Sequence, residues 1–248
     1  MTGPDPHRKD RRTFLRDGTA LALSAAASPA LLSGCASTAH FPAPDGHAAT
    51  TVNAGDAWSY DELNGYNSRR VAQLRFVAEH GGPPALRVSV EGDPLSGLRN
   101  GQLETYDSAW VVTRDGTYDR DNRYDPPLPL LPERLEPGAR ESWQSMVTHD
   151  EGERALRWHV RIDAIAGERI EVPAGSFDAL RVRRLIQFEH PDFFRSHSER
   201  TETLWYAPEV KRWVKREWRG SYRQKLDSRS PVMREDWIVW VLTDFTAA

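Results

Sequence analysis

Apolar and polar positions alternate with a period of two along most of the chain between residues 58 and 245. In one run Leu74 and Phe76 share a face, while Gln73 and Arg75 share the opposite one. The same pattern recurs at residues 86–90, 158–164 and 180–188. An apolar face opposite a polar face is typical of antiparallel strands. The pattern therefore predicts a mainly β domain of about nine to ten antiparallel strands with little helix.

Three segments depart from this alternation. Residues 237–242 are apolar on both faces, which indicates a central or covered strand. A short helix is expected near residues 63–70. Residues 125–132 contain four prolines, and proline cannot donate to a strand ladder. We therefore expect an extended loop there, which packs its leucines over the end of the sheet.

The first 34 residues have the zones of an export signal. A basic segment carries Arg11 and Arg12, followed by Phe14 and Leu15, and an uncharged stretch rich in Ala and Leu extends to residue 32. The arginine pair with Phe-Leu resembles the signal of the twin-arginine pathway, with general secretion as the alternative. The alternative of a membrane-spanning helix needs roughly 20 apolar residues, which is more than this stretch offers.

The only cysteine of the chain closes the tetrad Leu32-Ser33-Gly34-Cys35. This tetrad resembles the lipobox of bacterial lipoproteins. The resemblance implies that cleavage leaves Cys35 as the first mature residue and that its thiol carries lipid. Two or more acyl chains give stable membrane attachment. Ala36 follows, and in such lipoproteins this favours the outer membrane, facing the periplasm.

Composition divides the chain into three parts: a signal peptide at 1–34, a lipidated Cys with a flexible tether at 35–55, and a β domain at 56–248. The signal holds five of the 33 Lys and Arg and three of the 36 Asp and Glu, which leaves a net charge of −5 on the remainder. An acidic mature chain argues against nucleic-acid binding. With its only cysteine lipidated, the domain has no disulfide and depends on packing alone.

Two turn motifs carry a further resemblance. The first is the run Val172-Pro173-Ala174-Gly175-Ser176-Phe177, and the second is Trp205-Tyr206-Ala207-Pro208. Proline followed by glycine suits a hairpin turn, in which glycine takes a left-handed conformation. In this order the motifs resemble an uncharacterised family of exported bacterial β-rich proteins. That resemblance implies a single strongly curved antiparallel sheet, open or a half-barrel, similar to the half-barrel of periplasmic lipoprotein carriers.

Few residues form a pattern that indicates metal binding or catalysis. His190 and His197, with carboxylates nearby, are candidate zinc ligands, although their spacing matches no metal pattern and also suits a polar hairpin tip. Aspartates 115, 119, 121 and 125 resemble a calcium loop without its Gly and Glu. Neither a catalytic constellation nor a cofactor motif is present, so no cofactor is expected and the chain is not expected to be an enzyme.

Basic residues gather on two strands beside tryptophans, at 181–184 and 211–219. They are interpreted either as a surface for an anionic partner or as cross-strand pairs with the interleaved glutamates.

These observations predict an envelope lipoprotein whose concave sheet, lined by Leu, Val, Phe and Trp, binds an apolar ligand such as a lipid or acyl chain. A scaffold or assembly factor that contacts an envelope protein is the alternative, and an envelope hydrolase is the third.

Overall fold

A computed structural model describes residues 51–149, 153–225 and 230–248. These residues form twelve strands and one short 3₁₀ helix. In chain order the elements are β1 (Ala57–Asn64), β2 (Arg69–His80), β3 (Ala85–Gly92), β4 (Leu103–Ser108), β5 (Val111–Asp115), η1 (Thr117–Asp119), β6 (Asn122–Pro129), β7 (Arg140–His149), β8 (Leu156–Val172), β9 (Gly175–Phe188), β10 (Arg195–Ala207), β11 (Arg212–Gln224) and β12 (Val232–Thr246). Within this part of the chain, no helix has the length and apolar character needed to cross a membrane.

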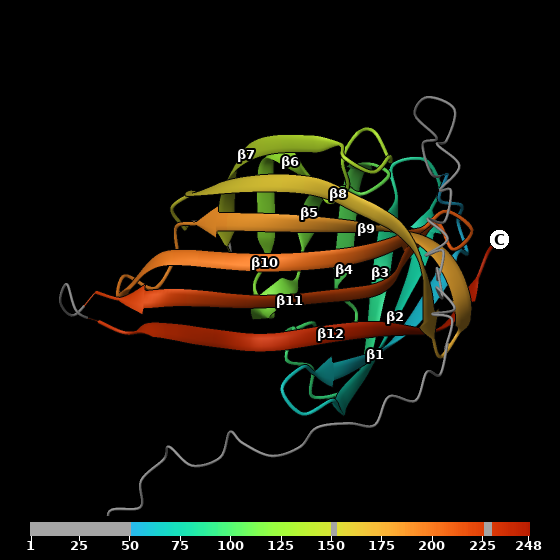
Figure 1. Ribbon diagram of the computed structural model, residues 1–248, viewed down its shortest axis with the longest axis horizontal. Helices are drawn as coiled ribbons and strands as arrows, with labels where there is room; N and C mark the ends of the chain where they lie inside the picture. Colours follow the sequence, from blue (N-terminus) through green and yellow to red (C-terminus); the bar gives the residue numbers. More distant parts are fainter. Residues whose placement is uncertain (1–50, 150–152, 226–229) are drawn as a thin grey trace, which may run out of the picture. The chain divides into compact units, whose positions relative to one another are not determined.

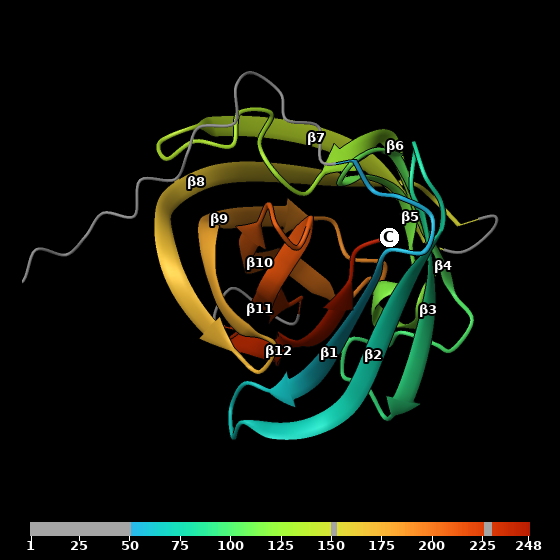
Figure 2. The same ribbon diagram turned by 90° about the vertical axis from the view of Figure 1, so that its right-hand side faces the viewer.

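The sheet closes on itself as a barrel. Each strand pairs antiparallel with its neighbours in sequence, and β1 pairs with β12 as well as with β2. In Figure 1, β9 to β12 lie across the picture, and β4 to β6 cross their direction. Figure 2, a view turned by 90°, shows β8 curving around one side of the barrel. The expected mainly β, antiparallel class is confirmed, whereas the open or half-barrel sheet of nine to ten strands is wrong.

The alternation seen in the sequence corresponds to the inside and the outside of the barrel. On β2, Leu74, Phe76 and Ala78 are buried, and the residues between them are more exposed. The double-sided apolar run at 237–242 belongs to β12, which pairs with both β1 and β11. Like every strand of the closed barrel, β12 therefore has a neighbour on each side.

The helix expected near residues 63–70 is wrong, because these residues form the end of β1, a turn, and the start of β2. Asparagine side chains stabilise the turn: Tyr66 N donates to Asn64 Oδ1 at 2.9 Å, and Arg69 N donates to Asn67 Oδ1 at 3.0 Å. Ser68 has a φ of 57°. Such local side-chain hydrogen bonds compete with helix formation.

The proline-rich segment is a strand rather than the expected loop. β6 pairs with β7 as far as Asp125 and with β5 at Leu128 and Pro129, so the ladder skips Pro126 and Pro127. Side chains of β7 satisfy the carbonyls at this gap. Ser145 Oγ donates to Pro126 O at 2.8 Å, and Trp143 Nε1 donates to Pro127 O at 3.0 Å. The leucines are buried, as expected: Leu128, Leu130 and Leu131.

An aromatic cluster fills part of the barrel interior. It has two groups of three rings, with ring-centroid distances of 5.2 to 6.0 Å within each group: Trp58, Trp110 and Trp213, and Tyr60, Phe76 and Trp240. Arg212 is fully buried among these rings, with its guanidinium carbon 4.1 Å from the Phe76 centroid. Here the interior is closely packed.

Candidate functional site

A second part of the interior holds a cavity of about 430 Å³. Its lining comes from β5, η1 and β6 on one side and from β9 to β12 on the other, with the end of β7 and the start of β8. One portion of the wall is apolar and includes Val112, Leu128, Leu130, Ile186 and Phe188. The rest carries arginines and carboxylates. The expectation of a concave surface lined by Leu, Val, Phe and Trp is therefore incomplete.

An ion triad lies deep in this wall. Glu202 on β10 stands directly opposite Arg184 on β9, and its carboxylate pairs with both Arg184 and Arg216. Arg184 and Glu202 each have side chains only 2% exposed. Burial alone would raise the pKa of Glu202, but the charges of Arg216 and Arg184 outweigh it and the pKa is lowered. The carboxylate is therefore ionised at neutral pH, and the triad has a net charge of +1.

Several buried N–H groups in the lining have no protein partner. They are Nε and Nη2 of Arg184, Nε of Arg200 and Nε1 of Trp158. Arg200 otherwise pairs with Glu235 at 3.1 Å and lies over the rings of Tyr118 and Phe188. A buried donor without an acceptor costs free energy. Such groups therefore mark the places where an acceptor from a ligand would be stabilised.

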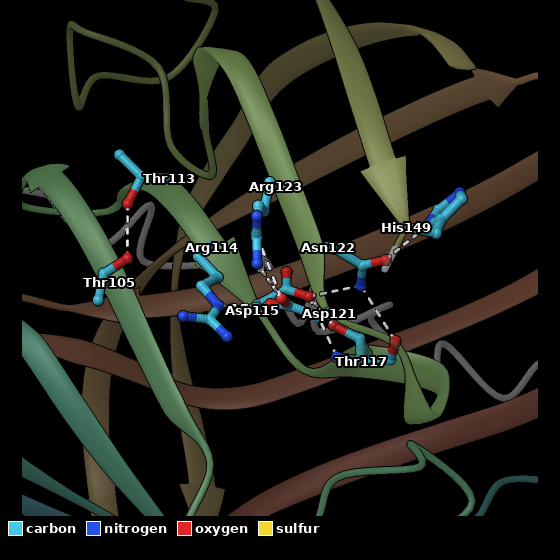
Figure 3. A network of polar contacts seen from close by, with 9 residues as sticks. All are labelled: Thr105, Thr113, Arg114, Asp115, Thr117, Asp121, Asn122, Arg123 and His149. Carbon is cyan, nitrogen blue, oxygen red and sulfur yellow. Dashed lines mark hydrogen bonds and ion pairs between the residues drawn. The ribbon is translucent and has the colours of Figure 1, made fainter. Parts of the chain in front are cut away.

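A polar network closes the side of the cavity formed by β5 to β7 (Figure 3). Asn122 Nδ2 donates to Asp115 Oδ1 at 2.7 Å and to Thr117 O at 3.0 Å, so its Oδ1 faces His149 Nδ1 at 2.6 Å. His149 Nδ1 must then carry the proton. Asp115 also accepts from Thr117 N, Thr117 Oγ1 and Tyr124 OH. Its carboxylate is occupied by neutral donors and not by an arginine of the cavity.

A second ion pair closes the cavity near β12. Glu235 accepts from Arg195 at 3.4 Å and from Arg200 at 3.1 Å. Its side chain passes over Gly220 of β11, where a Cβ atom would collide with Glu235 Oε2. A larger residue at this position would therefore require the end of the Glu235 side chain to move. Beside the pair, burial raises the pKa of Tyr118 to about 12, so its hydroxyl stays protonated.

The end of the barrel at the cavity carries exposed apolar side chains. Of the eight large apolar residues that the described part of the chain exposes, four lie here, in the β9–β10 loop and at the start of β12: Phe193, Phe194, Val232 and Met233. Lys225 N donates to Phe194 O at 2.7 Å, and Arg223 pairs with Val232, so these segments are adjacent. We call these four residues the apolar rim. Within the apolar rim, Phe193 is 86% exposed.

The export signal and the lipidation site lie outside the described residues. They comprise Arg11, Arg12, Phe14, Leu15, Leu32, Ser33, Gly34 and Cys35.

The turn motifs lie at the end of the barrel that joins β8 to β9 and β10 to β11. Pro173 forms the β8–β9 turn with Ala174, and Gly175 opens β9 with a φ of 136°. Phe177 is buried against Phe245. Trp205 and Tyr206 end β10 as buried residues, and Pro208 begins the turn to β11. These residues do not line the cavity.

The candidate metal ligands do not assemble into a site. His190 lies at the cavity, its Nδ1 accepts from Asp192 N at 3.0 Å, and its Nε2 lies 3.4 Å from Arg195 Nη1. Burial first, and then the charge of Arg195, lower its pKa to about 4. His197 is exposed on β10. Over residues 51–149, 153–225 and 230–248, no three His, Cys, Asp or Glu side chains group as metal ligands would.

Three of the four aspartates of the calcium alternative are occupied by other partners. Asp119 pairs with Arg99, and Asp121 pairs with Arg114 and Arg123 (Figure 3). Asp115 belongs to the network with Asn122. This segment is therefore held by ion pairs and hydrogen bonds within the protein.

The basic strands divide between outside and inside. Arg181 pairs with Glu168, and Arg183 pairs with Asp163, as cross-strand pairing predicts. Arg184, Arg212 and Arg216 instead point into the barrel, with side chains at most 13% exposed. The inward position of Arg184 was visible in the sequence, because this residue interrupts an apolar face between Val182 and Ile186. That interruption is the signal of a buried charge that strand reasoning missed.

Comparisons with known proteins add little to this picture. No family model matches the chain, and no curated protein matches it either. A candidate lipoprotein from Parabacteroides distasonis has 12% identity, a TM-score of 0.42, and an alignment that covers 79% of this chain and 97% of its own. A candidate exported protein with a YmcC-like fold from Bacteroides fragilis has 9% identity, a TM-score of 0.35 and the same coverage. Likeness this low carries no argument, so function is inferred from the cavity itself.

Proposed function

We propose that this chain is a non-catalytic envelope lipoprotein that binds a small amphiphilic ligand inside its barrel. The single observation that supports ligand binding is the cavity of about 430 Å³, which lies beside a closely packed aromatic cluster. Its volume falls in the range of about 300–1,000 Å³ that is usual for small-molecule sites. Apolar and charged walls face the same space, which suits an amphiphile better than the purely apolar ligand expected from the sequence.

The proposed location depends on the N-terminal segment. The twin-arginine pair Arg11-Arg12 supports export of the chain, and the lipobox ending at Cys35 supports attachment through lipid. Both features favour a periplasmic position, and Ala36 after the cysteine favours the outer membrane. A ligand-binding domain held there by a tether would meet amphiphiles that leave or enter the membrane.

Native mass spectrometry of the full chain, extracted from its own membrane, tests this function. We expect a mass that fits an acylated N-terminal Cys35 and a second species with a bound small molecule. Cys35→Ser should move the chain to the soluble fraction without loss of the bound species. A chain found free in the cytosol with Met1 intact would contradict the anchor.

A pair of neighbouring positions on β9 tests the cavity. Ile186 lines the cavity, whereas the neighbouring Leu185 does not. Ile186→Trp should fill the space and remove the bound species, and Leu185→Trp should keep it. Circular dichroism reports whether each variant folds. Equal loss or equal retention of the small molecule in both variants would place the ligand elsewhere and overturn the proposal.

The alternative of a scaffold lipoprotein is favoured by the apolar rim, which exposes Phe193 and Val232 to solvent at 86% and 54%. An envelope protein with an apolar surface is the partner it would contact. Crosslinking in whole cells from a photoreactive residue at position 193 tests this role. Reproducible protein adducts, absent when the probe stands at the exposed position 171 near the end of β8, would support the scaffold.

A further inference from the structure

We propose that the ligand carries an anionic oxygen group and that this group binds to buried N–H donors of the cavity, which belong to Arg184, Arg200 and Trp158. This inference rests on the proposed function, because it names the chemical class of the ligand for that same cavity. The class is a single-headed anionic amphiphile: a carboxylate, sulfonate or phosphate group with a compact apolar body. Neither the membrane anchor nor the apolar rim is needed for it.

The first step is the type of the unpartnered groups. Arg184 Nε and Nη2, Arg200 Nε and Trp158 Nε1 are all N–H donors, and all belong to residues that line the cavity. Donors require acceptors, and arginine offers a planar fork that matches two oxygens of one anion. A ligand that brought only donors, such as an ammonium group, would leave every one of these groups without a partner.

The second step is the local charge. One carboxylate, Glu202, serves both Arg184 and Arg216. Over the whole cavity lining, six arginines face five carboxylates, so the lining carries a net charge of +1. Asp115 is one of these five carboxylates, and its oxygens already accept from Thr117, Asn122 and Tyr124, so it is not paired with Arg184. An anion at Arg184 would neutralise the excess charge, and a cation there would be repelled.

The third step is the remainder of the wall. Val112, Leu128, Leu130 and Ile186 offer an apolar surface within the same cavity. A ligand of inorganic phosphate alone would leave this surface uncovered. An apolar body attached to the anion would bury it, which is favourable.

Three probes with the same tail separate charge from apolar burial: decanoate, decanol and decyltrimethylammonium. Isothermal titration calorimetry on the full chain at pH 7, below the micelle concentration of each probe, measures their affinities. We expect decanoate to bind at least about tenfold more tightly than the other two, since hydrogen bonds to charged groups are the strong ones.

Variants identify the atoms responsible. Trp158→Phe keeps an aromatic ring and removes the Nε1 donor, so it should fold and weaken decanoate alone. Arg184→Lys keeps the charge and loses the fork, and Arg184→Gln loses both, so the preference for decanoate should fall in that order. Arg181→Gln, on the outer face of the same strand, is the matched control and should bind as the parent does.

The outcomes separate this inference from the function on which it rests. Equal binding of decanol and decanoate would keep the ligand cavity and overturn the anionic head. Tighter binding of decyltrimethylammonium would also overturn it. Absence of binding by all three, in a chain that carries no ligand of its own in native mass spectrometry, would overturn the cavity as a ligand site. Should Arg184→Gln fail to fold, unchanged decanoate affinity in Trp158→Phe and Arg184→Lys would still refute the inference.

Discussion

At the scale of single residues, the barrel interior contains charges that packing alone would not select. A buried ion pair is weak evidence for stability, because desolvation can cancel the attraction between the charges. Glu202 nevertheless lies between Arg184 and Arg216 with almost no exposure. The arrangement is easier to understand as a binding feature that keeps one arginine available than as a stabilising feature of the core.

Glu202→Gln is the residue-scale prediction. The substitution leaves two buried guanidinium groups without a counter-charge, so the free energy of unfolding should fall by about 3–5 kcal/mol at pH 7. Chemical denaturation measures it. Glu199→Gln, at a more exposed position on the same strand, is the control and should change stability by less than about 1 kcal/mol.

The difference in unfolding free energy between the parent and Glu202→Gln should depend on pH. The pKa of Glu202 in the folded chain is lowered from its ordinary value of 4.5. A lowered pKa means that the carboxylate contributes stability above about pH 4.5, which is lost as pH falls through the folded-state value. The gap in stability between the parent and Glu202→Gln should therefore narrow in acid. A gap that stays constant down to pH 3 would contradict the ionised triad.

At the scale of elements, β6 shows how a proline-rich segment is accepted between two neighbours. Pro126 and Pro127 cannot donate to either ladder, and pairing skips them on both sides. Their carbonyls accept from Ser145 Oγ and Trp143 Nε1 on β7. Side chains of the neighbouring strand therefore donate to the proline carbonyls where the backbone ladder is interrupted.

Ser145→Ala is the element-scale prediction. It removes the donor to Pro126 O in a buried position, and a lost hydrogen bond of this kind costs about 1–3 kcal/mol. Hydrogen exchange should show faster opening of β6 and β7 than of β9 and β10. Ser142→Ala, exposed on the same strand, should leave exchange unchanged. Equal protection in both variants would show that the side-chain bond does not hold β6.

At the scale of the whole molecule, closure is the decisive feature, because a closed sheet has no exposed edge. The seam is the pairing of β1 with β12 over eight residue pairs, between segments from opposite ends of the domain. Gly65 and Trp237 add to this seam, with Gly65 N donating to Trp237 O at 2.7 Å. The cavity exists only because the sheet closes into a barrel and its strands surround one interior.

Val241→Pro tests closure. Val241 pairs with Asp61 of β1 and Lys215 of β11, so a proline there removes a ladder donor inside the circuit. We expect a loss of more than about 2 kcal/mol in the free energy of unfolding and weaker protection of β1. Val232→Pro is the control, because proline is tolerated as the first residue of a strand. Comparable stability of the two variants would contradict a tightly closed seam.

The sequence by itself determined the class of the fold. Alternation with a period of two defines which side chains face inward, and this property needs no knowledge of neighbouring strands. It predicted β2, β3, β8 and β9, and the part of β12 at residues 237–242. Short strands such as β4 and β5 offer too few residues for a period to be recognised, and the prolines of β6 concealed a strand.

Only the tertiary structure decided closure, the cavity and the inward arginines. Pairing between β1 and β12 joins residues at opposite ends of the domain, and no local pattern encodes such a contact. The sequence shows Arg184 on an apolar face, but its meaning depends on Glu202 opposite it and on Trp158 across the register from Phe188. A binding site depends on distances between strands, whereas a strand depends on the order of its own residues.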